Sequence, residues 1–284
     1  MKMSAFLFLA ACLVNAEEFN RTIEKSLPMP PNGILDVCNI NGSIRIEPGG
    51  GSEVRFSIRE HIEAPSREKM DGVKRGTDVV FNQDGNRVKA GVKGPWSDVP
   101  CGEKSSGRRR WESGRGIEIV HEMTIQAPRD VRFEISTVNG GVELKDSRGD
   151  YQLKTVNGSV KLTDAEGSGS VTTVNGSVTA VYRNNPRSDS QFKTVNGKVE
   201  LYLQPGLNAE FHMKTVNGSA YTDFDMTPIG TEFTTRSTNS NTPGKIVYKR
   251  GNAIALRAGN GGAKLTAETV NGSVLLHSLA KGRP

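Results

Sequence analysis

The stretch Phe133-Glu-Ile-Ser-Thr137-Val-Asn139-Gly140-Gly-Val142-Glu-Leu144 holds the element that decides the fold. Its tetrapeptide Thr-Val-Asn-Gly occurs six times, beginning at Thr137, Thr155, Thr173, Thr194, Thr215 and Thr269. The first five copies follow one another at intervals of 18, 18, 21 and 21 residues, and the sixth follows after 54. A fixed period of about twenty residues is typical of stacked supersecondary units. The repeats therefore predict the architecture more directly than they predict a ligand.

Around each copy the apolar residues alternate with polar ones. Before the corner of the second copy, Leu153 and Thr155 share one face of a strand, and after it Val160 and Leu162 share one face. Polar residues 163–169 then lead to the next copy. Each unit is predicted to be a short strand, a corner at Asn-Gly, a second short strand and a polar return.

Two architectures fit this local pattern. Asn-Gly between alternating strands is a strong signal for an antiparallel hairpin with a type I′ turn. Alternatively, Asn-Gly forms the corner of a β-solenoid coil, in which each strand pairs with its equivalent about 4.8 Å away. We favour an all-β single-chain β-solenoid, because only stacking requires identical residues at identical corners. In that model, columns of Thr and buried Asn exchange hydrogen bonds, and Gly supplies a positive φ.

The predicted corners extend beyond the six exact copies. Asn39-Ile-Asn41-Gly42-Ser-Ile44 resembles the same corner near the start of the chain. Asn239 and the pair Asn260-Gly261 suggest that the 54-residue gap holds degenerate coils. The structural corners are Asn41, Gly42, Asn139, Gly140, Asn157, Gly158, Asn175, Gly176, Asn196, Gly197, Asn217, Gly218, Asn271 and Gly272.

Four segments follow from this pattern. Residues 1–16 form a leader, residues 17–136 form N-terminal strands continuous with the repeats, residues 137–277 form the repeat solenoid, and residues 278–284 are a tail. Alternating apolar residues such as Val54, Phe56 and Ile58 predict further strands with one buried face. The one candidate helix covers Pro65 to Lys74. The 32 glycines and the aromatic content of 6% suit short strands and tight turns.

The first sixteen residues read as an export signal. Lys2 is basic, residues 5–13 are apolar, and Val14-Asn15-Ala16 offers a small-residue cleavage site. A second interpretation is a lipobox ending at Cys12, which would then carry a lipid anchor. No other segment is apolar enough for a membrane helix. We expect an exported protein that is periplasmic, at the cell surface or extracellular.

The remaining two cysteines and the net charge give weaker signals. Cys38 and Cys101 would form a disulfide in an oxidising compartment, or stay as two thiols. The net charge of +6 is a mild basic bias that suits anionic envelope polymers but also an ordinary solvated surface.

Residues 93–116 interrupt the strand pattern and predict a long loop. This loop combines two tryptophans with four arginines, and its candidate partner-contact residues are Trp96, Arg108, Arg109, Arg110 and Trp111. Arginine pairs with phosphate or carboxylate, and tryptophan stacks on rings. The same composition also occurs in solvated loops without a partner.

The chain resembles the bacterial adhesin-like, or toast-rack, family of exported β-repeat domains. The resemblance rests on residues 39–46, on residues 131–142 and on residues 261–274, and it covers nearly all of the chain after the leader. It implies a β-solenoid-like fold in the cell envelope and no catalytic residues. The loop at 93–116 is not part of the family pattern.

Motifs for chemistry are sparse. A polysaccharide lyase or hydrolase needs clustered carboxylates, and the only candidates are Asp223 and Asp225, predicted on one side of a strand. The four histidines have no metal-ligand spacing, so no cofactor or metal is expected. Only residues 108–111 combine the basic and aromatic character that nucleic-acid binding needs, and the expected export argues against that function.

The sequence therefore predicts a non-enzymatic, adhesin-like binding or scaffold module whose partner is an envelope protein or polysaccharide. A carbohydrate-active enzyme on a β-solenoid is the first alternative. A purely structural, self-assembling envelope element is the second.

Overall fold

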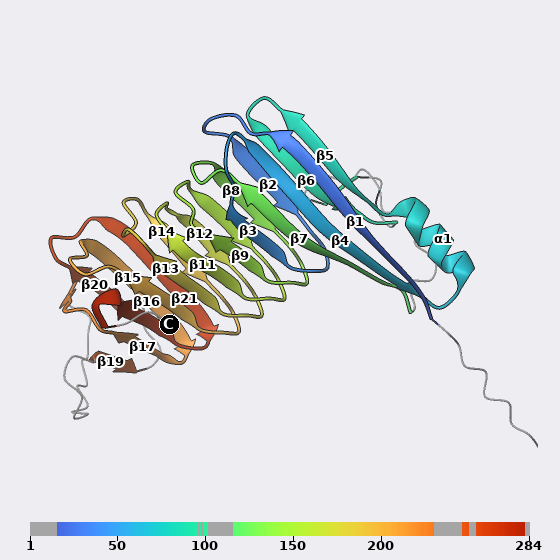
Figure 1. Ribbon diagram of the computed structural model, residues 1–284. Helices are drawn as coiled ribbons and strands as arrows, with labels where there is room; N and C mark the ends of the chain where they lie inside the picture. The colour runs from blue at the N-terminus through green and yellow to red at the C-terminus, as the bar shows by residue number, and fades with distance from the viewer. Residues whose placement is uncertain are drawn as a thin grey trace, which may run out of the picture.

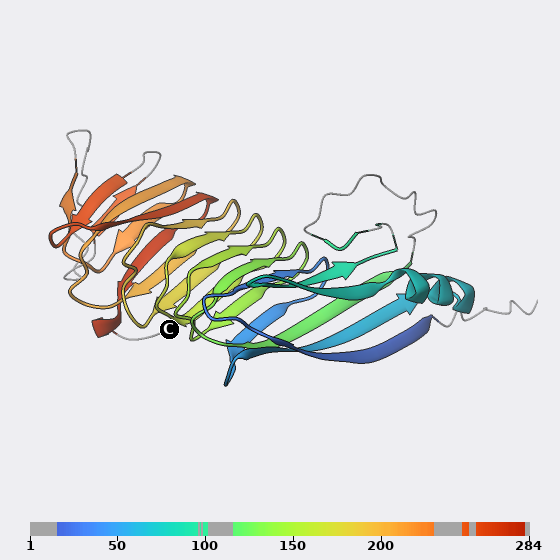
Figure 2. The ribbon, with the colours of Figure 1, turned by 90° about the horizontal axis from the view of Figure 1, so that it is seen from above.

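The computed structural model describes residues 16–95, 97, 99–101, 116–229, 246–249 and 254–281. This part of the chain is nearly all β, with two large and mostly parallel sheets and one α-helix. The sheets face each other along an elongated body, with the N-terminal strands and the helix at one end (Figures 1 and 2).

The strand order of each sheet departs from chain order. The first sheet contains β1 (Glu17–Pro28), β4 (Glu53–Ala64), β7 (Glu118–Ala127), β3 (Ile44–Pro48), β9 (Val142–Lys145), β11 (Val160–Ala165), β13 (Val178–Tyr182), β15 (Val199–Leu203), β22 (Val274–Ser278), β17 (Ser219–Thr222) and β19 (Ile246–Lys249). The second sheet contains β18 (Thr227–Pro228), β20 (Ile254–Ala258), β16 (Ala209–Asn217), β21 (Ala263–Asn271), β14 (Ser190–Lys193), β12 (Gly169–Thr172), β10 (Tyr151–Lys154), β8 (Arg132–Ser136), β2 (Ile34–Cys38), β6 (Arg87–Lys93) and β5 (Asp78–Asp84).

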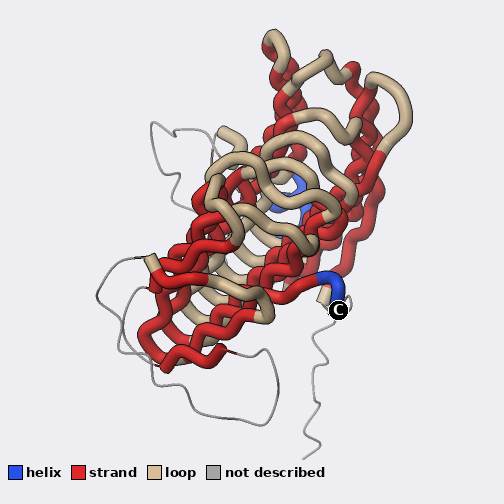
Figure 3. Tube along the Cα trace, turned by 90° about the vertical axis from the view of Figure 1, so that its left-hand side faces the viewer, coloured by secondary structure: helices blue, strands red, loops and turns tan. Residues whose placement is uncertain are grey.

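Each Asn-Gly corner carries the chain from one sheet to the other, and Figure 3 shows the strands as two walls joined by loops. At the first copy, β8 lies in the second sheet and β9 in the first. Because the strands that flank a corner do not pair with each other, the hairpin alternative is wrong. Equivalent strands pair in parallel instead, and Val160 lies between Val142 and Val178. The predicted unit of strand, corner, strand and polar return is confirmed.

The core lies between the two sheets, and every second side chain along each strand points into it. On the second sheet Leu153, Val171 and Phe192 are in register and fully buried. On the first sheet Leu162 is likewise buried, beside Leu144 and Ala180. This alternation confirms the predicted strands with one buried face, and it leaves the other side chain of each pair on an outer face.

The corner asparagines form a ladder along the outside of the stack. Each side-chain Nδ2 donates to the Oδ1 of the next asparagine at 2.7–2.8 Å, in the order Asn217, Asn271, Asn196, Asn175, Asn157, Asn139 and Asn41. Asn41 then donates to the carbonyl oxygen of Ile119 at 3.1 Å. All of these asparagines except the half-buried Asn41 are exposed. The expectation of a ladder is confirmed, but the expectation that its amides are buried is wrong.

The buried column belongs to the threonines. Thr155 Oγ1 donates to the carbonyl oxygen of Gly140 at 2.8 Å, and the other five copies make the same bond to a neighbouring layer. The threonines therefore do not bond to one another, contrary to the expectation. Each hydroxyl satisfies a carbonyl at the corner, where the ladder between strands ends.

The corner glycines are required mainly because the layers approach closely. Among them only Gly42 and Gly197 have a positive φ. The prediction that glycine is needed at each corner for a positive φ is therefore wrong for the other corner glycines. A Cβ added at Gly158 would lie 2.1 Å from the carbonyl oxygen of Gly140, and the other copies meet the preceding layer in the same way. Backbone therefore occupies the space in which any side chain would begin.

The sixth copy lies inside the stack rather than at its end. Strand β21 pairs in parallel with β14 on one side and with β16 on the other. Asn271 consequently lies between Asn196 and Asn217. The strands β19 and β20, which precede β21, pair antiparallel with β17 and β16, so they are not degenerate coils. Asn239 lies outside the described residues.

The N-terminal strands extend both sheets. Asn41 pairs with Asn139, and β2 and β3 lie in parallel register with β8 and β9. The helix α1 (Arg67–Gly76) begins after the N-cap Ser66, close to the predicted span, and its Met70 and Val73 pack in a small second core. A 3₁₀ turn at Leu279–Lys281 follows the last strand. Within the described ranges, no helix combines the length and apolarity needed to cross a membrane.

A buried Glu–His pair with an exposed arginine beside it lies in this N-terminal region. Glu60 and His121, each with 1% of its side chain exposed, face each other across β4 and β7, with 3.0 Å between Glu60 Oε1 and His121 Nε2. Arg21 on β1 donates to the same carboxylate, with 2.5 Å between Nε and Oε2. Burial acts to raise the pKa of Glu60, but the hydrogen bonds from His121 and Arg21 outweigh it, so the pKa is lowered.

We expect Gly158→Ala to destabilise the protein by about 3 kcal/mol, the upper part of the range for overpacking, because the obstructing atom is backbone. The matched control is Gly50→Ala, where an added Cβ meets no atom within 4 Å. Urea denaturation followed by circular dichroism measures both free energies of unfolding. Equal values for the two variants would contradict the role assigned to close approach.

We expect the contribution of Glu60 to the free energy of unfolding to vary with pH. A carboxyl whose pKa is lower in the folded state stabilises that state above its unfolded pKa of about 4.3. This contribution is lost as the pH falls through the lower, folded pKa. The difference in unfolding free energy between wild type and Glu60→Gln should therefore shrink below about pH 4. A constant Glu60 difference between pH 7 and pH 3 would refute the assignment.

Candidate functional site

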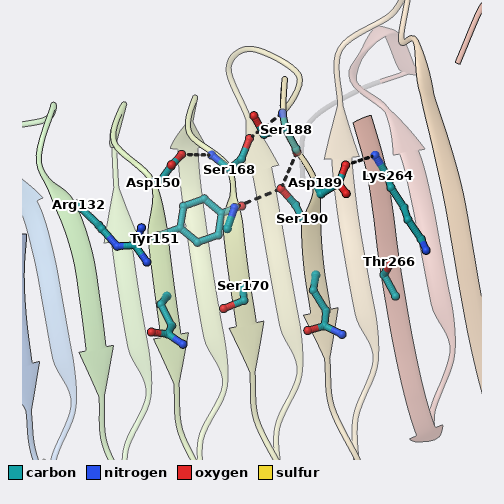
Figure 4. Close-up of a pocket in the computed structure, with 13 residues that line it drawn as sticks. Arg132, Asp150, Tyr151, Ser168, Ser170, Ser188, Asp189, Ser190, Lys264 and Thr266 are labelled. Atoms are coloured by element: carbon teal, nitrogen blue, oxygen red, sulfur yellow. Dashed lines mark hydrogen bonds between the residues drawn. The ribbon is translucent and has the colours of Figure 1, made fainter. Parts of the chain in front are cut away.

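The outer face of the second sheet contains a polar cavity of about 430 Å³ over the strands β8, β10, β12, β14 and β21. Figure 4 shows its side chains on neighbouring strands. The lining residues are Arg132, Asp150, Tyr151, Gln152, Ser168, Gly169, Ser170, Ser188, Asp189, Ser190, Gln191, Lys264 and Thr266. Their spacing follows the repeat at four of the five strands. The residues three and five positions before the threonines at 155, 173, 194 and 269 all line the cavity, whereas β8 contributes Arg132 alone.

The upper rim of the cavity is fixed by bonds between successive layers. Asp150 Oδ1 accepts from the backbone N–H of Ser168 at 3.1 Å, and Ser168 Oγ accepts from that of Ser188 at 3.2 Å. Asp189 Oδ1 accepts from the N–H of Lys264 at 2.8 Å. Both carboxylates therefore hold backbone, and the rim is positioned before any ligand arrives.

Behind the rim, a buried hydroxyl cluster supports the layers from inside. The Tyr151 hydroxyl contacts those of Tyr182 and Ser190. Burial raises the pKa of both tyrosines well above the ordinary value, so both stay protonated at neutral pH. Ser190 Oγ also accepts from the N–H of Gly169 at 3.2 Å. The cluster fixes three adjacent strands at the point where the cavity forms.

The floor of the cavity consists of side chains that point outward. Gln152, Ser170, Gln191 and Thr266 stand in one row across β10, β12, β14 and β21. In the described part of the structure, these four side chains make no hydrogen bond or ion pair. Arg132 lies at one end and donates to Glu134 at 3.0 Å, while Lys264 lies at the other. The floor can therefore donate and accept hydrogen bonds to a ligand.

The structure describes the two cysteines of the predicted disulfide but not the predicted contact residues of the loop at 93–116. Cys38 and Cys101 form a disulfide, with 5.7 Å between their Cα atoms. Trp96, Arg108, Arg109, Arg110 and Trp111, the predicted partner contacts, lie outside the described residues. Their role as partner contacts therefore remains a prediction from the sequence.

The two carboxylates considered for catalysis lie in the segment that follows a strand. Asp223 and Asp225 follow β17 instead of lying within it, and Asp225 is exposed. Asp223 Oδ2 lies 3.2 Å from Nδ1 of His277, whose ring stacks on Tyr202 with centroids 4.7 Å apart. Among the described residues, no group of three or more His, Cys, Asp or Glu side chains is arranged to hold a metal ion.

No protein-family model matches the chain, and no curated protein matches it. Three solved structures are similar over 91% of this chain. A "putative cell adhesion protein" from Clostridium sporogenes has 12% identity and a TM-score of 0.40 over 100% of its own chain. A "putative adhesin" from Bacteroides fragilis has 10% identity and a TM-score of 0.36 over 97% of its chain. A "putative lipid binding protein" from Parabacteroides distasonis has 10% identity and a TM-score of 0.28 over 96% of its chain.

At these identities and TM-scores, the function of this chain must be argued from its own residues. The resemblance to the toast-rack family remains a prediction from sequence.

We expect Ser190→Ala to lower the free energy of unfolding by about 1–3 kcal/mol, because it leaves buried polar partners unsatisfied. Ser170→Ala, on the neighbouring strand β12 and on the open floor, should change it by less than about 0.5 kcal/mol. Urea denaturation of the two variants beside wild type checks both values. A Ser190→Ala protein as stable as Ser170→Ala would remove the supporting role of the hydroxyl cluster.

Proposed function

We propose that the protein is a non-enzymatic, adhesin-like binding module of the cell envelope, built on a β-solenoid. The observation that carries this proposal is the polar cavity on the second sheet. Its floor presents side chains with unused hydrogen-bonding capacity, and its rim is held by bonds between layers. A rigid surface with free polar groups loses little conformational entropy when it binds.

Export is part of the proposal. The apolar leader and its small-residue cleavage site support passage out of the cytoplasm. The Cys38–Cys101 disulfide supports an oxidising compartment, since disulfides are rare in the reducing cytosol. Cleavage after Ala16 and lipidation at Cys12 remain the two alternatives for the N-terminus.

A carbohydrate-active enzyme is the second candidate, and the Asp223–His277 pair is the observation that favours it. A carboxylate that orients a histidine is a common component of acid–base sites. Two carboxylates on strands of the same sheet are already paired, Glu143 with Arg45 at 3.0 Å and Glu200 with Lys198 at 2.8 Å. Turnover of a polysaccharide that disappears in Asp223→Asn would favour this candidate over the binding module.

We expect the purified mature protein to retain a component of solubilised cell envelope, detected by mass spectrometry and glycan analysis. Lys264→Glu, which reverses the charge at one end of the cavity, should weaken retention at least fivefold if this site is used. Replacing Arg108, Arg109 and Arg110 with Ser should weaken it instead if the loop is the contact, and should flatten its salt dependence. Failure of the wild-type protein to retain any component would overturn the binding-module proposal.

A further inference from the structure

The floor of the cavity has a spatial period of two strands. Its row reads Gln152, Ser170, Gln191 and Thr266, so a long amide side chain alternates with a short hydroxyl side chain. Neighbouring parallel strands lie about 4.8 Å apart. The two glutamines therefore stand about 9.6 Å apart, with a shorter residue between them.

We propose that this row binds an extended, hydroxyl-rich polysaccharide that crosses the strands, with one sugar above each strand. The proposal rests on the binding-module function and specifies its ligand. One pyranose with its glycosidic oxygen spans a length close to the strand spacing. In a flat chain with alternating ring orientation, equivalent hydroxyls recur at every second sugar, and this matches the alternation of Gln with Ser or Thr.

The chemistry of the floor supports a sugar ligand. Each glutamine amide offers two donors and one acceptor, and each hydroxyl offers one donor and accepts as well. Sugar hydroxyls have the same mixed character. The four residues of the floor row carry no charge, and their side chains have no internal partners in the described structure. The equivalent position on β8 is Glu134, whose carboxylate is already held by Arg87 and Arg132. A ligand can therefore form bonds here without breaking existing ones.

Other polymers fit this row less well. An extended peptide repeats on one face at about 6.6–6.8 Å, which does not match the two-strand period. A peptide also binds sheets by pairing at an edge, whereas β12 is paired on both sides with β10 and β14. A lipid chain would need apolar contacts, which the floor row does not provide.

The extent of the cavity across the strands sets the length of oligosaccharide that we expect to bind. On β8 the residue paired with Gln152 is Glu134, and Arg132 lies two residues before it. On β21 Lys264 lies two residues before Thr266. The cavity therefore spans five adjacent strands. Affinity should increase with chain length up to about five sugars, one above each strand at the spacing of about 4.8 Å, and then stay constant.

The test is isothermal titration of the full mature protein with β-1,4-linked oligosaccharides of glucose, xylose and N-acetylglucosamine, from two to eight units long. We expect at least one series to bind with the predicted plateau. α-1,4-linked glucose oligomers, which coil instead of lying flat, should bind at least tenfold more weakly. A plateau reached at two sugars, or equal binding of the coiled series, would overturn the proposed register.

Substitutions in the floor row test whether the oligosaccharide binds there. Replacing both Gln152 and Gln191 with Ala should weaken binding at least tenfold, as expected for the loss of several hydrogen bonds. The matched control is Gln126→Ala, an exposed glutamine on β7 of the other sheet. As a second variant, Ser170→Arg should block the row by steric overlap. Thermal denaturation confirms that each variant is folded. Unchanged binding both in the double Gln152 and Gln191 variant and in Ser170→Arg would overturn the proposal.

The outcomes also separate this inference from the function on which it rests. If no oligosaccharide binds but the protein retains an envelope protein or lipid, the polysaccharide proposal fails and the binding module stands. If the protein retains nothing from the envelope and binds no oligosaccharide, both fail.

Discussion

The parallel register between successive layers is the constraint on which the rest of the structure depends. It is set at the corners, where backbone of one layer contacts backbone of the next and only glycine fits. The asparagine ladder adds one hydrogen bond per layer on the outside, and the threonine column adds one on the inside. Because side chains alternate along each strand, a shift of one residue would exchange the core and the outer face. The corners therefore determine which residues form the cavity floor.

Much of the architecture could be predicted from the sequence, because the repeat is almost exact. Identical tetrapeptides predicted the corners, and alternation predicted the buried faces, including Leu153 and Leu162. The environments of Asn and Gly were harder to predict. Asparagine at a corner fits a ladder whether it is buried or exposed, and glycine is compatible with either a positive φ or a close approach. Composition does not separate these cases, whereas the positions of neighbouring atoms do.

The candidate site was missed for a different reason. Gln152, Ser170, Gln191 and Thr266 lie far apart in the sequence and form no recognisable motif together. Their common signal is position, since each stands three residues before a Thr-Val-Asn-Gly threonine. Reading down this column of the aligned repeats would have found the row. The order of the layers was not available from the alignment, because the sixth copy occupies a place that chain order does not indicate.

That placement has a consequence for biosynthesis. The ribosome completes β16 and β17 before β21 and β22, yet in the finished protein β21 separates β14 from β16, and β22 separates β15 from β17. The fifth copy therefore has no permanent neighbour towards the fourth until residues 263–278 emerge. Loss of residues 263–278 would remove a layer from within the stack and leave a gap there, whereas most repeat proteins lose a terminal layer when they are shortened.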